Sequence, residues 1–528
     1  MADIDKVQEK PKAEAQPAFE SSVQPVVAKQ EGDHRSVSST RTAAANENED
    51  DHEYPKGVKL GLITLALCLA VFLMALLMFG KFYTYFSIKW TFIVAITIFE
   101  IGSLVCGVAP TSDALIIGRA IAGIGSAGVF SGALIIIAHS VPLAKRPIFT
   151  GVIGAMYGLA SVAGPLLGGV FTDKVTWRWC FYINLPIGAV TLIVIALFFK
   201  SPPRRKGAQI DTWRDGLRKF DSLGTLAFLP AIISLLLALQ WGGTKYPWGN
   251  GRIIGLFVVF GVLIVVFIGI QIWKQDDATV PPRILKQRSI LASAWFAFCL
   301  GASFFIMVFY IPIWFQAIKG TTAVKSGIDN LPMILGVVVA SLLSGVAISA
   351  TGYYAPWMIL CTVLATVGGG LISTFEPDTM SPRWIGFQVI YGLGIGVGMQ
   401  QPLMAAQTVL PLQDVPSGTA IIVFTQTVGG AIFISIAQNV FTNKLVTGIV
   451  KNAPGLNPGI VLGAGATMLK IAVPSEFLAG VIRAYNDALV TAFYVSIAMA
   501  GLTVFGSLTV EWKSVKKSGN GGAVMHAA

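Results

Sequence analysis

Residues 253–273 read IIGLFVVFGVLIVVFIGIQIW, without one charged side chain. A helix needs about 20 mainly apolar residues to cross a bilayer. Similar runs recur along the chain, which has 528 residues, is 54% hydrophobic and only 12% charged, and has a mean hydropathy of +0.70. A soluble domain carries about 25% charged residues. We therefore predict an all-α integral membrane protein.

Thirteen apolar runs are long enough to be membrane spans, with edges defined to within a few residues. They lie at 60–79, 91–109, 114–138, 147–170, 180–200, 222–241, 253–273, 291–315, 330–350, 355–374, 385–406, 418–441 and 486–509. Long membrane chains with two similar halves are common among transporters. The runs accordingly predict two helix bundles plus two extra spans, with five runs in the first bundle and six in the second.

The domain division follows from these runs and from the polar stretches between them. The first 56 residues are polar and acidic, and such a composition cannot bury enough surface to become ordered. The predicted parts are a disordered tail (1–56), an N-terminal helix bundle (57–200), a cytoplasmic basic loop (201–221), two extra spans (222–273), a C-terminal six-span bundle (274–512) and a cytoplasmic tail (513–528).

Basic residues predict the orientation of the spans, because lysine and arginine collect in cytoplasmic loops. The basic loops are those of Lys81 and Lys89, of Lys145 and Arg146, the 201–221 stretch, the 274–288 stretch and the final tail. An even number of runs separates each neighbouring pair, so all can face the cytoplasm together. The N-terminal tail alone would lie on the other side. The net charge of +11 therefore reflects topology and does not indicate nucleic-acid binding.

An ordered set of motifs in the first bundle resembles the fourteen-span drug:proton antiporters of the major facilitator superfamily. The motifs are Gly118-Arg119 with Gly123, Gly125 and Gly128; Gly158, Gly164-Pro165 and Gly168-Gly169; the stretch from Trp177 to Gly188; and Gly80-Lys81 through Lys89-Trp90. In the second bundle, the stretch from Tyr310 to Pro332, with Trp314-Phe315-Gln316, is similar to the fungal toxin-efflux subgroup. The resemblance covers roughly residues 58–512 and implies the major facilitator fold.

One departure from the family pattern concerns the run at 60–79. Phe72 to Leu76 resembles the middle of the family's first span, and it joins directly to Leu77–Lys81, which resembles the end of the second span. One N-terminal crossing is therefore expected to be missing, and restoring it would take at least about 20 residues plus a turn. We expect a chain that lacks this helix to fold poorly and to transport little.

Two ionisable residues lie within apolar runs, Arg119 and Glu100. A charge in a span costs at least about 2.5 kcal/mol, so it tends to face a polar cavity and to have a partner. The resemblance implies that Arg119 takes part in proton coupling, and Glu100 is the carboxylate that could carry the proton. The alternative for Glu100 is a structural bridge between helices.

The antiporter motif comprises Gly158, Gly164, Pro165, Gly168 and Gly169. Spacings of four residues place small surfaces on one helix face, which permits close packing, and Pro165 removes a backbone donor. The resemblance implies that this helix prevents leakage of protons or substrate. Ordinary tight packing is the alternative.

Uncharged hydrogen-bonding side chains in the second bundle suit a cavity for large, mostly apolar substrates. The candidates are Gln316, Gln388, Gln400, Gln401, Gln426 and the aromatic Phe424. Any single glutamine could instead bond two helices together.

The sequence contains no phosphate-binding loop of an ATP-driven pump and no catalytic or metal-ligand constellation, and its five cysteines lie in apolar runs without paired spacing. We therefore expect no enzyme, no cofactor and no metal. The leading hypothesis is a monomeric secondary transporter in the plasma membrane, with the vacuolar membrane as the alternative, that exports small lipophilic drugs or toxins in exchange for protons. A truncated or degenerate non-transporting paralogue and an uptake carrier for siderophores or nutrients stay open as alternatives.

Overall fold

The computed structural model describes residues 75–199, 221–243 and 246–516. Within these ranges every regular element is a helix, and the only β-type pairings are isolated bridges between Gly242 and Tyr246 and between Tyr353 and Ser514. The prediction of an all-helical fold is confirmed. The predicted tail at 1–56, most of the loop at 201–221, and most of the 60–79 run lie outside the described residues.

The first block begins with a helical stretch over residues 75–85. Its further elements are α2 (Ile88–Val108), α3 (Ser112–Ser140), η1 (Leu143–Lys145), α4 (Arg146–Lys174), α5 (Trp179–Tyr182) and α6 (Asn184–Phe198). The two extra spans follow as α8 (Ser222–Trp241) and α9 (Gly251–Lys274).

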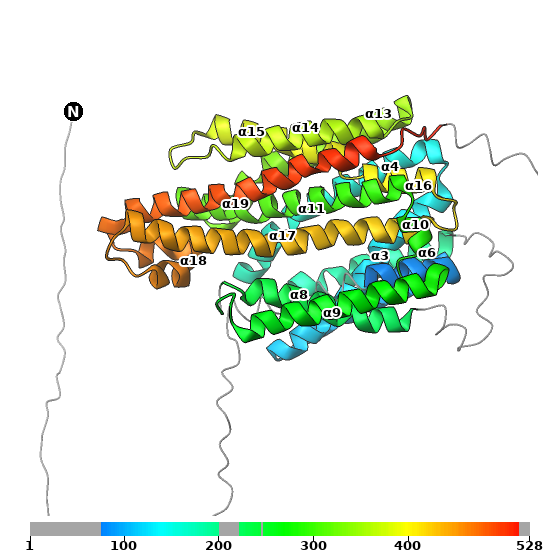
Figure 1. Ribbon diagram of the computed structural model, residues 1–528, viewed down its shortest axis with the longest axis horizontal. Helices are drawn as coiled ribbons and strands as arrows, with labels where there is room; N and C mark the ends of the chain where they lie inside the picture. The colour runs from blue at the N-terminus through cyan, green and yellow to red at the C-terminus, as the bar shows by residue number, and fades with distance from the viewer. Residues whose placement is uncertain (1–74, 200–220, 244–245, 517–528) are drawn as a thin grey trace, which may run out of the picture. The chain divides into compact units, whose positions relative to one another are not determined.

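The second block starts after a short linker that contains η2 (Gln275–Asp277) and α10 (Pro282–Leu285). Its elements are α11 (Arg288–Trp314), η3 (Phe315–Lys319), α12 (Ala323–Asp329), α13 (Leu331–Thr351), α14 (Ala355–Ile372), α15 (Ser381–Gly398), α16 (Gln401–Val409), α17 (Val415–Asn452), α18 (Pro458–Ala472) and α19 (Ser475–Thr509). The long helices of both blocks run roughly parallel (Figure 1).

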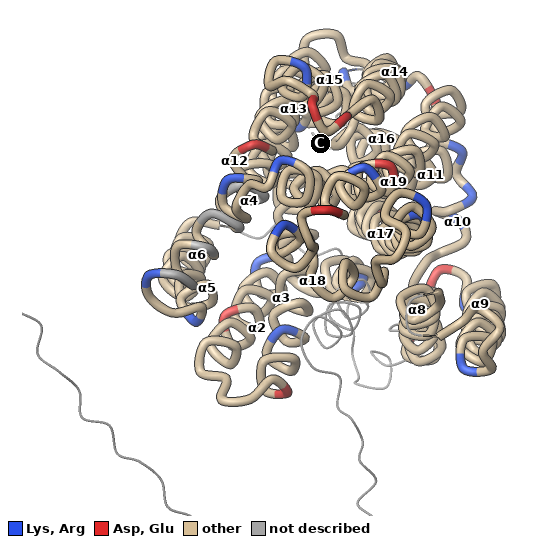
Figure 2. The backbone as a smooth tube through the Cα atoms, turned by 90° about the vertical axis from the view of Figure 1, so that its left-hand side faces the viewer, with Lys and Arg blue, Asp and Glu red and all other residues tan. Residues whose placement is uncertain are grey.

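Ten helices in the described ranges are long and apolar enough to cross a membrane, and each coincides with a predicted run. Two further runs, 147–170 and 385–406, lie on α4 and on α15 with α16. Charged residues are sparse along these helices (Figure 2). The apolar runs of the sequence therefore located the spans.

The second block is held together by a large shared core. Helix α11 packs along both α17 and α19, while α15 packs on both α13 and α14, and α14 contacts α19. The core contains Tyr310, Trp314 and Tyr391, each fully buried. One group of buried hydroxyls within it is paired: the Ser303 hydroxyl lies 2.8 Å from that of Tyr391 and 2.9 Å from that of Ser496.

In the first block the closest packing joins α2 and α3. A Cβ atom on Gly102 would overlap Ala122, and one on Gly125 would overlap the backbone of Phe99. Only glycine permits these approaches, since two helix backbones meet directly. The glycine motif that follows Arg119 is thus a helix-packing device in this fold.

The extra pair packs on itself and on α17. The rings of Phe228 on α8 and Phe267 on α9 lie 4.7 Å apart, and Phe424 of α17 lies 5.4 Å from Phe228. In the most apolar stretch of α9, only 11% of residues are buried. Helix α8 is therefore the member of the pair that joins the rest of the protein.

Candidate functional site between the two blocks

Among the described residues, the basic loop of Lys81, the basic stretch 274–288 and the end of α19 lie at one end of the helices, as the charge pattern predicts. The Lys81 ammonium donates to the carbonyl of Asp276 at 2.9 Å, and the Arg288 guanidinium donates to the carbonyl of Thr509 at 2.8 Å. Arg283 forms a two-pronged pair with Asp414, at 2.9 and 3.1 Å. We call the end at which these loops meet the basic end.

At the basic end α4 of the first block lies directly on α13 of the second. A Cβ atom on Gly151 would stand 2.6 Å from the carbonyl oxygen of Ser341, and one on Gly345 would stand 2.5 Å from that of Pro147. Further along, a Cβ atom on Gly158 of the antiporter motif would stand 2.7 Å from the Val338 side chain. Glycines from both blocks thus form this contact.

A second contact between the blocks joins the helical stretch 75–85 to the beginning of α17. A Cβ atom on Gly80 would lie 2.8 Å from that of Ala420 and 3.4 Å from the carbonyl oxygen of Pro416. The same stretch is fixed to α3, because the Tyr83 hydroxyl donates to the carbonyl of Gly128 at 2.9 Å. The two contacts close the interface of the blocks at the basic end.

Buried amides lie at this closure. Gln400 is 6% exposed, and its amide nitrogen would lie 2.7 Å from a Cβ atom on Gly154 of α4. Gln401 donates to the carbonyl of Val397 at 2.6 Å. Gln407, which the sequence analysis did not single out, is 3% exposed, and neither of its amide atoms has a hydrogen-bond partner among the described residues. Unpaired buried amides cost free energy, which water entering an opened interface would relieve.

The other predicted cavity residues lie elsewhere. Gln316 donates to the Ser326 hydroxyl at 2.9 Å, and the buried Gln388 donates to the carbonyl of Asp329 at 3.1 Å. Gln426 of α17 faces Gly301 of α11, while Phe424 packs toward α8. The structure therefore distributes the six candidates over several places and does not bring them into a single cavity.

Glu100 and Arg119 are not brought together either. The Glu100 carboxyl points at Gly188 of α6, and its buried Oε2 has no hydrogen-bond partner in the described ranges. Beside it, the Asn184 amide donates to the Ser103 hydroxyl at 3.2 Å. Arg119 is exposed on α3 and pairs with no residue that the structure describes.

The antiporter motif divides into two halves along α4. Gly158 packs on α13, whereas no described atom lies within 4 Å of a Cβ atom placed on Gly164. Gly168 belongs to the same later half of α4, and nothing is described around the side chains of Pro165 and Gly169. The close packing predicted for the whole motif is thus seen at its beginning.

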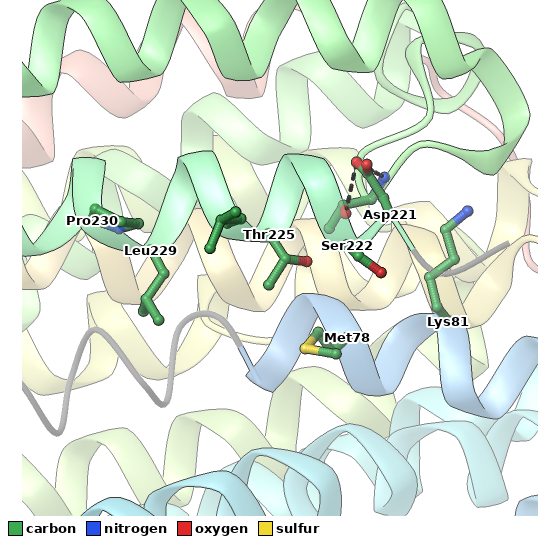
Figure 3. Close-up of a pocket in the computed structure, with 9 residues that line it drawn as sticks. Met78, Lys81, Asp221, Ser222, Thr225, Leu229 and Pro230 are labelled. Atoms are coloured by element: carbon green, nitrogen blue, oxygen red, sulfur yellow. Dashed lines mark hydrogen bonds between the residues drawn. The ribbon is translucent and has the colours of Figure 1, made fainter. Parts of the chain in front are cut away.

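Two neighbouring cavities lie between the first block and α8. One, of about 830 Å³, is lined mainly by apolar and aromatic side chains, among them Phe79, Phe82 and Trp90. The other, of about 310 Å³, shares Met78, Thr225 and Leu229 with it and ends at polar groups (Figure 3). Lys81 and Asp221 lie at that polar end, on opposite walls (Figure 3).

Asp221 is the best-connected carboxylate of the described residues. Its oxygens accept from Gln271 at 2.6 Å, from the Gly224 amide at 2.9 Å, and from the amide and hydroxyl of Thr279 at 3.2 and 3.1 Å. The Lys274 ammonium lies 3.4 Å away. Burial alone would raise the pKa of Asp221, but these hydrogen bonds and the nearby charge hold it below its usual value.

Burial has the dominant effect on Lys81. It lowers the pKa of Lys81 to about 8, although the carboxylates of Asp277, Asp221 and Asp276 act in the opposite direction. The sequence analysis treated Lys81 and Arg283 only as loop charges that report topology. Their contacts could have been predicted from the sequence. The predicted topology places Asp276 and Asp414 in loops at the same end of the helices, where these acidic residues are available as partners.

A sequence model described as Major Facilitator Superfamily matches residues 51–434. The "MFS-type efflux pump MFS1" of Arthroderma benhamiae is 55% identical, with 91% of this chain and 96% of that protein covered. The "Efflux pump aflT" of Aspergillus parasiticus is 47% identical, with coverage of 88% and 97%. Among solved structures, the human organic anion transporter MFSD10 has a TM-score of 0.53 at 14% identity, with 85% and 86% covered, a likeness of fold.

The alignments also show that this chain lacks residues that two of these relatives contain. The alignment with the A. benhamiae pump has 517 positions, whereas 91% of 528 residues is about 480, so about 37 positions have no counterpart in this chain. With the A. parasiticus pump, 503 positions compare with 88% of 528, about 465, which leaves about 38. By contrast, the "Efflux pump roqT" of Penicillium rubens aligns over 444 positions that correspond to 84% of this chain, which leaves no such excess.

Helices of membrane-spanning length in two packed blocks, the matching sequence model and relatives of about half-identical sequence agree on one class. The protein is a multi-pass membrane transporter rather than an enzyme. The chain belongs to the major facilitator superfamily, in the branch that contains the fungal efflux pumps.

Proposed function

We propose that this protein is a secondary active transporter that exports small lipophilic molecules in exchange for protons. The observation that carries the proposal is the closed interface at the basic end, where glycines of the motifs join α4 to α13 and the 75–85 stretch to α17. Relatives named as efflux pumps support export as the direction.

The mechanism follows from the two blocks. Rocking one block against the other would separate Gly80 from Ala420 and Gly151 from Ser341, and so admit a substrate from the basic end. Contacts made by glycine backbones suit this motion, because they can part without unpacking large side chains. The buried amides of Gln400, Gln401 and Gln407 would then line the opened path and meet water or substrate.

Glu100 is the proposed proton carrier. Its unpartnered oxygen lies between α2 and α6, inside the first block and away from the basic-end contacts. A carboxyl group in a span commonly marks a proton relay. Arg119 is proposed to attract this carboxylate in another conformation, since the described structure leaves the guanidinium without a partner.

The experiment uses the purified chain in lipid vesicles that contain a fluorescent lipophilic cation and carry an imposed pH gradient. If the chain transports as proposed, loss of the dye from the vesicle will depend on the gradient, and Glu100→Gln will abolish that dependence. Glu476→Gln, in the first turn of α19, is the matched control and should transport like the unmodified chain. Transport by Glu100→Gln that still follows the gradient would remove Glu100 from the mechanism.

A second candidate, a non-transporting chain, is favoured by the 37 to 38 alignment positions that lack a counterpart, about the length of one span plus a loop. The test inserts the corresponding segment of the A. benhamiae pump and compares both chains in the vesicle assay. Equal transport by the two would exclude this candidate. Transport by the restored chain alone would establish it.

A further inference from the structure

The extra pair α8–α9 is tied by Asp221 to the linker that follows it. Asp221 caps α8, accepts from Gln271 of α9, and accepts from both the amide and the hydroxyl of Thr279 in the linker. The carboxylate is fully buried, and its ion pair with Lys274 holds the end of α9 in the same cluster. The linker is therefore fixed at its first turn by the extra pair.

From this anchor the linker reaches both blocks. Asp276 accepts from Lys81 of the 75–85 stretch through its backbone carbonyl, at 2.9 Å. The Asp276 side chain pairs with Arg283 at 3.0 Å, and Arg283 also forms the two-pronged pair with Asp414, directly before α17. Lys81 and Asp414 thus belong to the two elements that meet at Gly80 and Ala420.

We propose that Lys81 and Arg283 are positioning residues that hold the basic end closed by fastening both blocks to the linker of the extra pair. The inference rests on the proposed alternating access, because it assigns these residues to one of its two states. It gives the two extra spans a mechanical role. They anchor the linker between α9 and α11, residues 275–287, which we call the strap because it joins the two elements that meet at Gly80 and Ala420. Opening at the basic end requires the strap to release at least one block.

The experiment measures access to the covered surface. Ser417 is 9% exposed, and its Cα atom would lie 3.7 Å from a Cβ atom on Gly80, so Ser417→Cys places a thiol under the strap with little change in size. The purified chain in lipid nanodiscs is labelled with a maleimide, and the chain without this added thiol gives the background rate. We expect Arg283→Gln to raise the labelling rate of the introduced thiol by about two- to fivefold. Lys81→Met should raise it above about pH 8, where the neutral amine of Lys81 can still donate to the Asp276 carbonyl.

The matched control is Lys325→Gln. Lys325 forms an ion pair of 3.1 Å with Asp329 next to α13, away from the strap, and its replacement should leave the labelling rate unchanged. Asp414→Asn should raise the rate as much as Arg283→Gln, and the double variant should add nothing further, because both remove the same pair. Unchanged labelling in Arg283→Gln, or additive effects in the double variant, would overturn the proposal.

One further measurement, and the independence of labelling from substrate, separate this inference from its premises. The thermal unfolding midpoint of each variant shows whether faster labelling reflects a released strap or a loosened fold, and we expect it to stay the same. Labelling needs no transported substrate, so the strap can be confirmed even if the vesicle assay shows no proton-driven efflux. Faster labelling together with a lowered midpoint would assign these residues a merely structural role.

Discussion

Two segments of equal hydropathy have opposite surroundings in this protein. Residues Trp179–Phe198 of the first block and Arg288–Lys319 of the second both reach a mean hydropathy of 2.2, yet 6% of the former stretch and 67% of the latter are buried. Lipid tails are as apolar as a protein core, so hydropathy cannot distinguish the two environments. The buried segment, Arg288–Lys319, differs in its many small residues, which allow neighbouring helices to approach, and in polar side chains such as Ser303, which hydrogen-bond to those helices.

The same contrast separates the blocks as a whole. The second block packs its long helices around Tyr310, Trp314 and Tyr391, whereas in the first block α2 has close partners in α3 and α6 and α4 packs mainly on α13. The absence of one helix from the first block would produce this pattern. Helix α4 would keep its partner α13 in the second block but would lose a partner within its own block.

The largest expected effect compares matched glycines in the two blocks. Gly392→Val would press a side chain against the backbone of Met333, and we expect it to lower the free energy of unfolding by about 1–3 kcal/mol or more. Gly164→Val replaces a helical glycine whose added side chain would have no described atom within 4 Å of its Cβ, and should change stability by less than about 0.5 kcal/mol. Thermal unfolding in detergent measures both, and equal losses would contradict the contrast between the blocks.

A smaller effect is expected from replacing asparagines that hydrogen-bond to a neighbouring helix. In the second block Asn486 accepts from the Trp314 indole at 2.8 Å and donates to the carbonyl of Phe375 at 3.0 Å. Asn486→Leu leaves the Trp314 indole N–H and the Phe375 carbonyl without this partner, and should lower the free energy of unfolding by about 1–3 kcal/mol.

Asn184→Leu is the matched change in the first block, where a single 3.2 Å bond to Ser103 is lost. Hydrogen bonds between membrane helices average about 0.6 kcal/mol, so its loss in unfolding free energy should be clearly smaller. The same unfolding assay compares the two variants. A larger loss for Asn184→Leu would show that the first block depends more on its polar contacts than its packing indicates.

The sequence predicted the fold well but did not determine how the candidate site residues are arranged, for identifiable reasons. The uncharged run at 253–273 and its counterparts predict spans because lipid selects for apolar residues along the whole helix. The glycine motif predicted close helix packing because a missing side chain is a local property of the sequence, and the structure shows such a contact at Gly158 but none with a described atom at Gly164. Neither argument requires knowledge of which helices are neighbours.

The site depends on that missing knowledge. The six cavity candidates were chosen by residue type, and the structure places Gln316 and Gln388 with the second block's own α12 but Gln400 at its contact with α4. The pair of Arg283 with Asp414 joins residues 131 positions apart. Such contacts are decided by the packing of whole helices, which a single sequence does not specify.

The last expected effect concerns pH and the contact between the blocks. When the basic end is closed, burial lowers the pKa of Lys81 from 10.5 to about 8. If the 75–85 stretch leaves α17 when this end opens, the ammonium meets water, and we expect its pKa to return toward its ordinary value of 10.5. The closed state therefore binds this proton more weakly than the open state, and raising the pH from about 8 to 10 should favour closure, by less than tenfold per pH unit.

The labelling rate of the thiol introduced by Ser417→Cys measures this shift if each rate is divided by that of the Lys81→Met variant at the same pH, which cancels the ionisation of the thiol. The other groups around Lys81 are Asp221, Asp276, Asp277, Lys274 and Tyr85, and burial raises the pKa of Tyr85 above its usual value. All of them remain in the Lys81→Met reference. We expect the ratio to fall as the pH rises, because only the chain with Lys81 gains closure on losing this proton. A ratio independent of pH would mean that Lys81 is equally buried in both states, and that the first block does not leave the linker when the basic end opens.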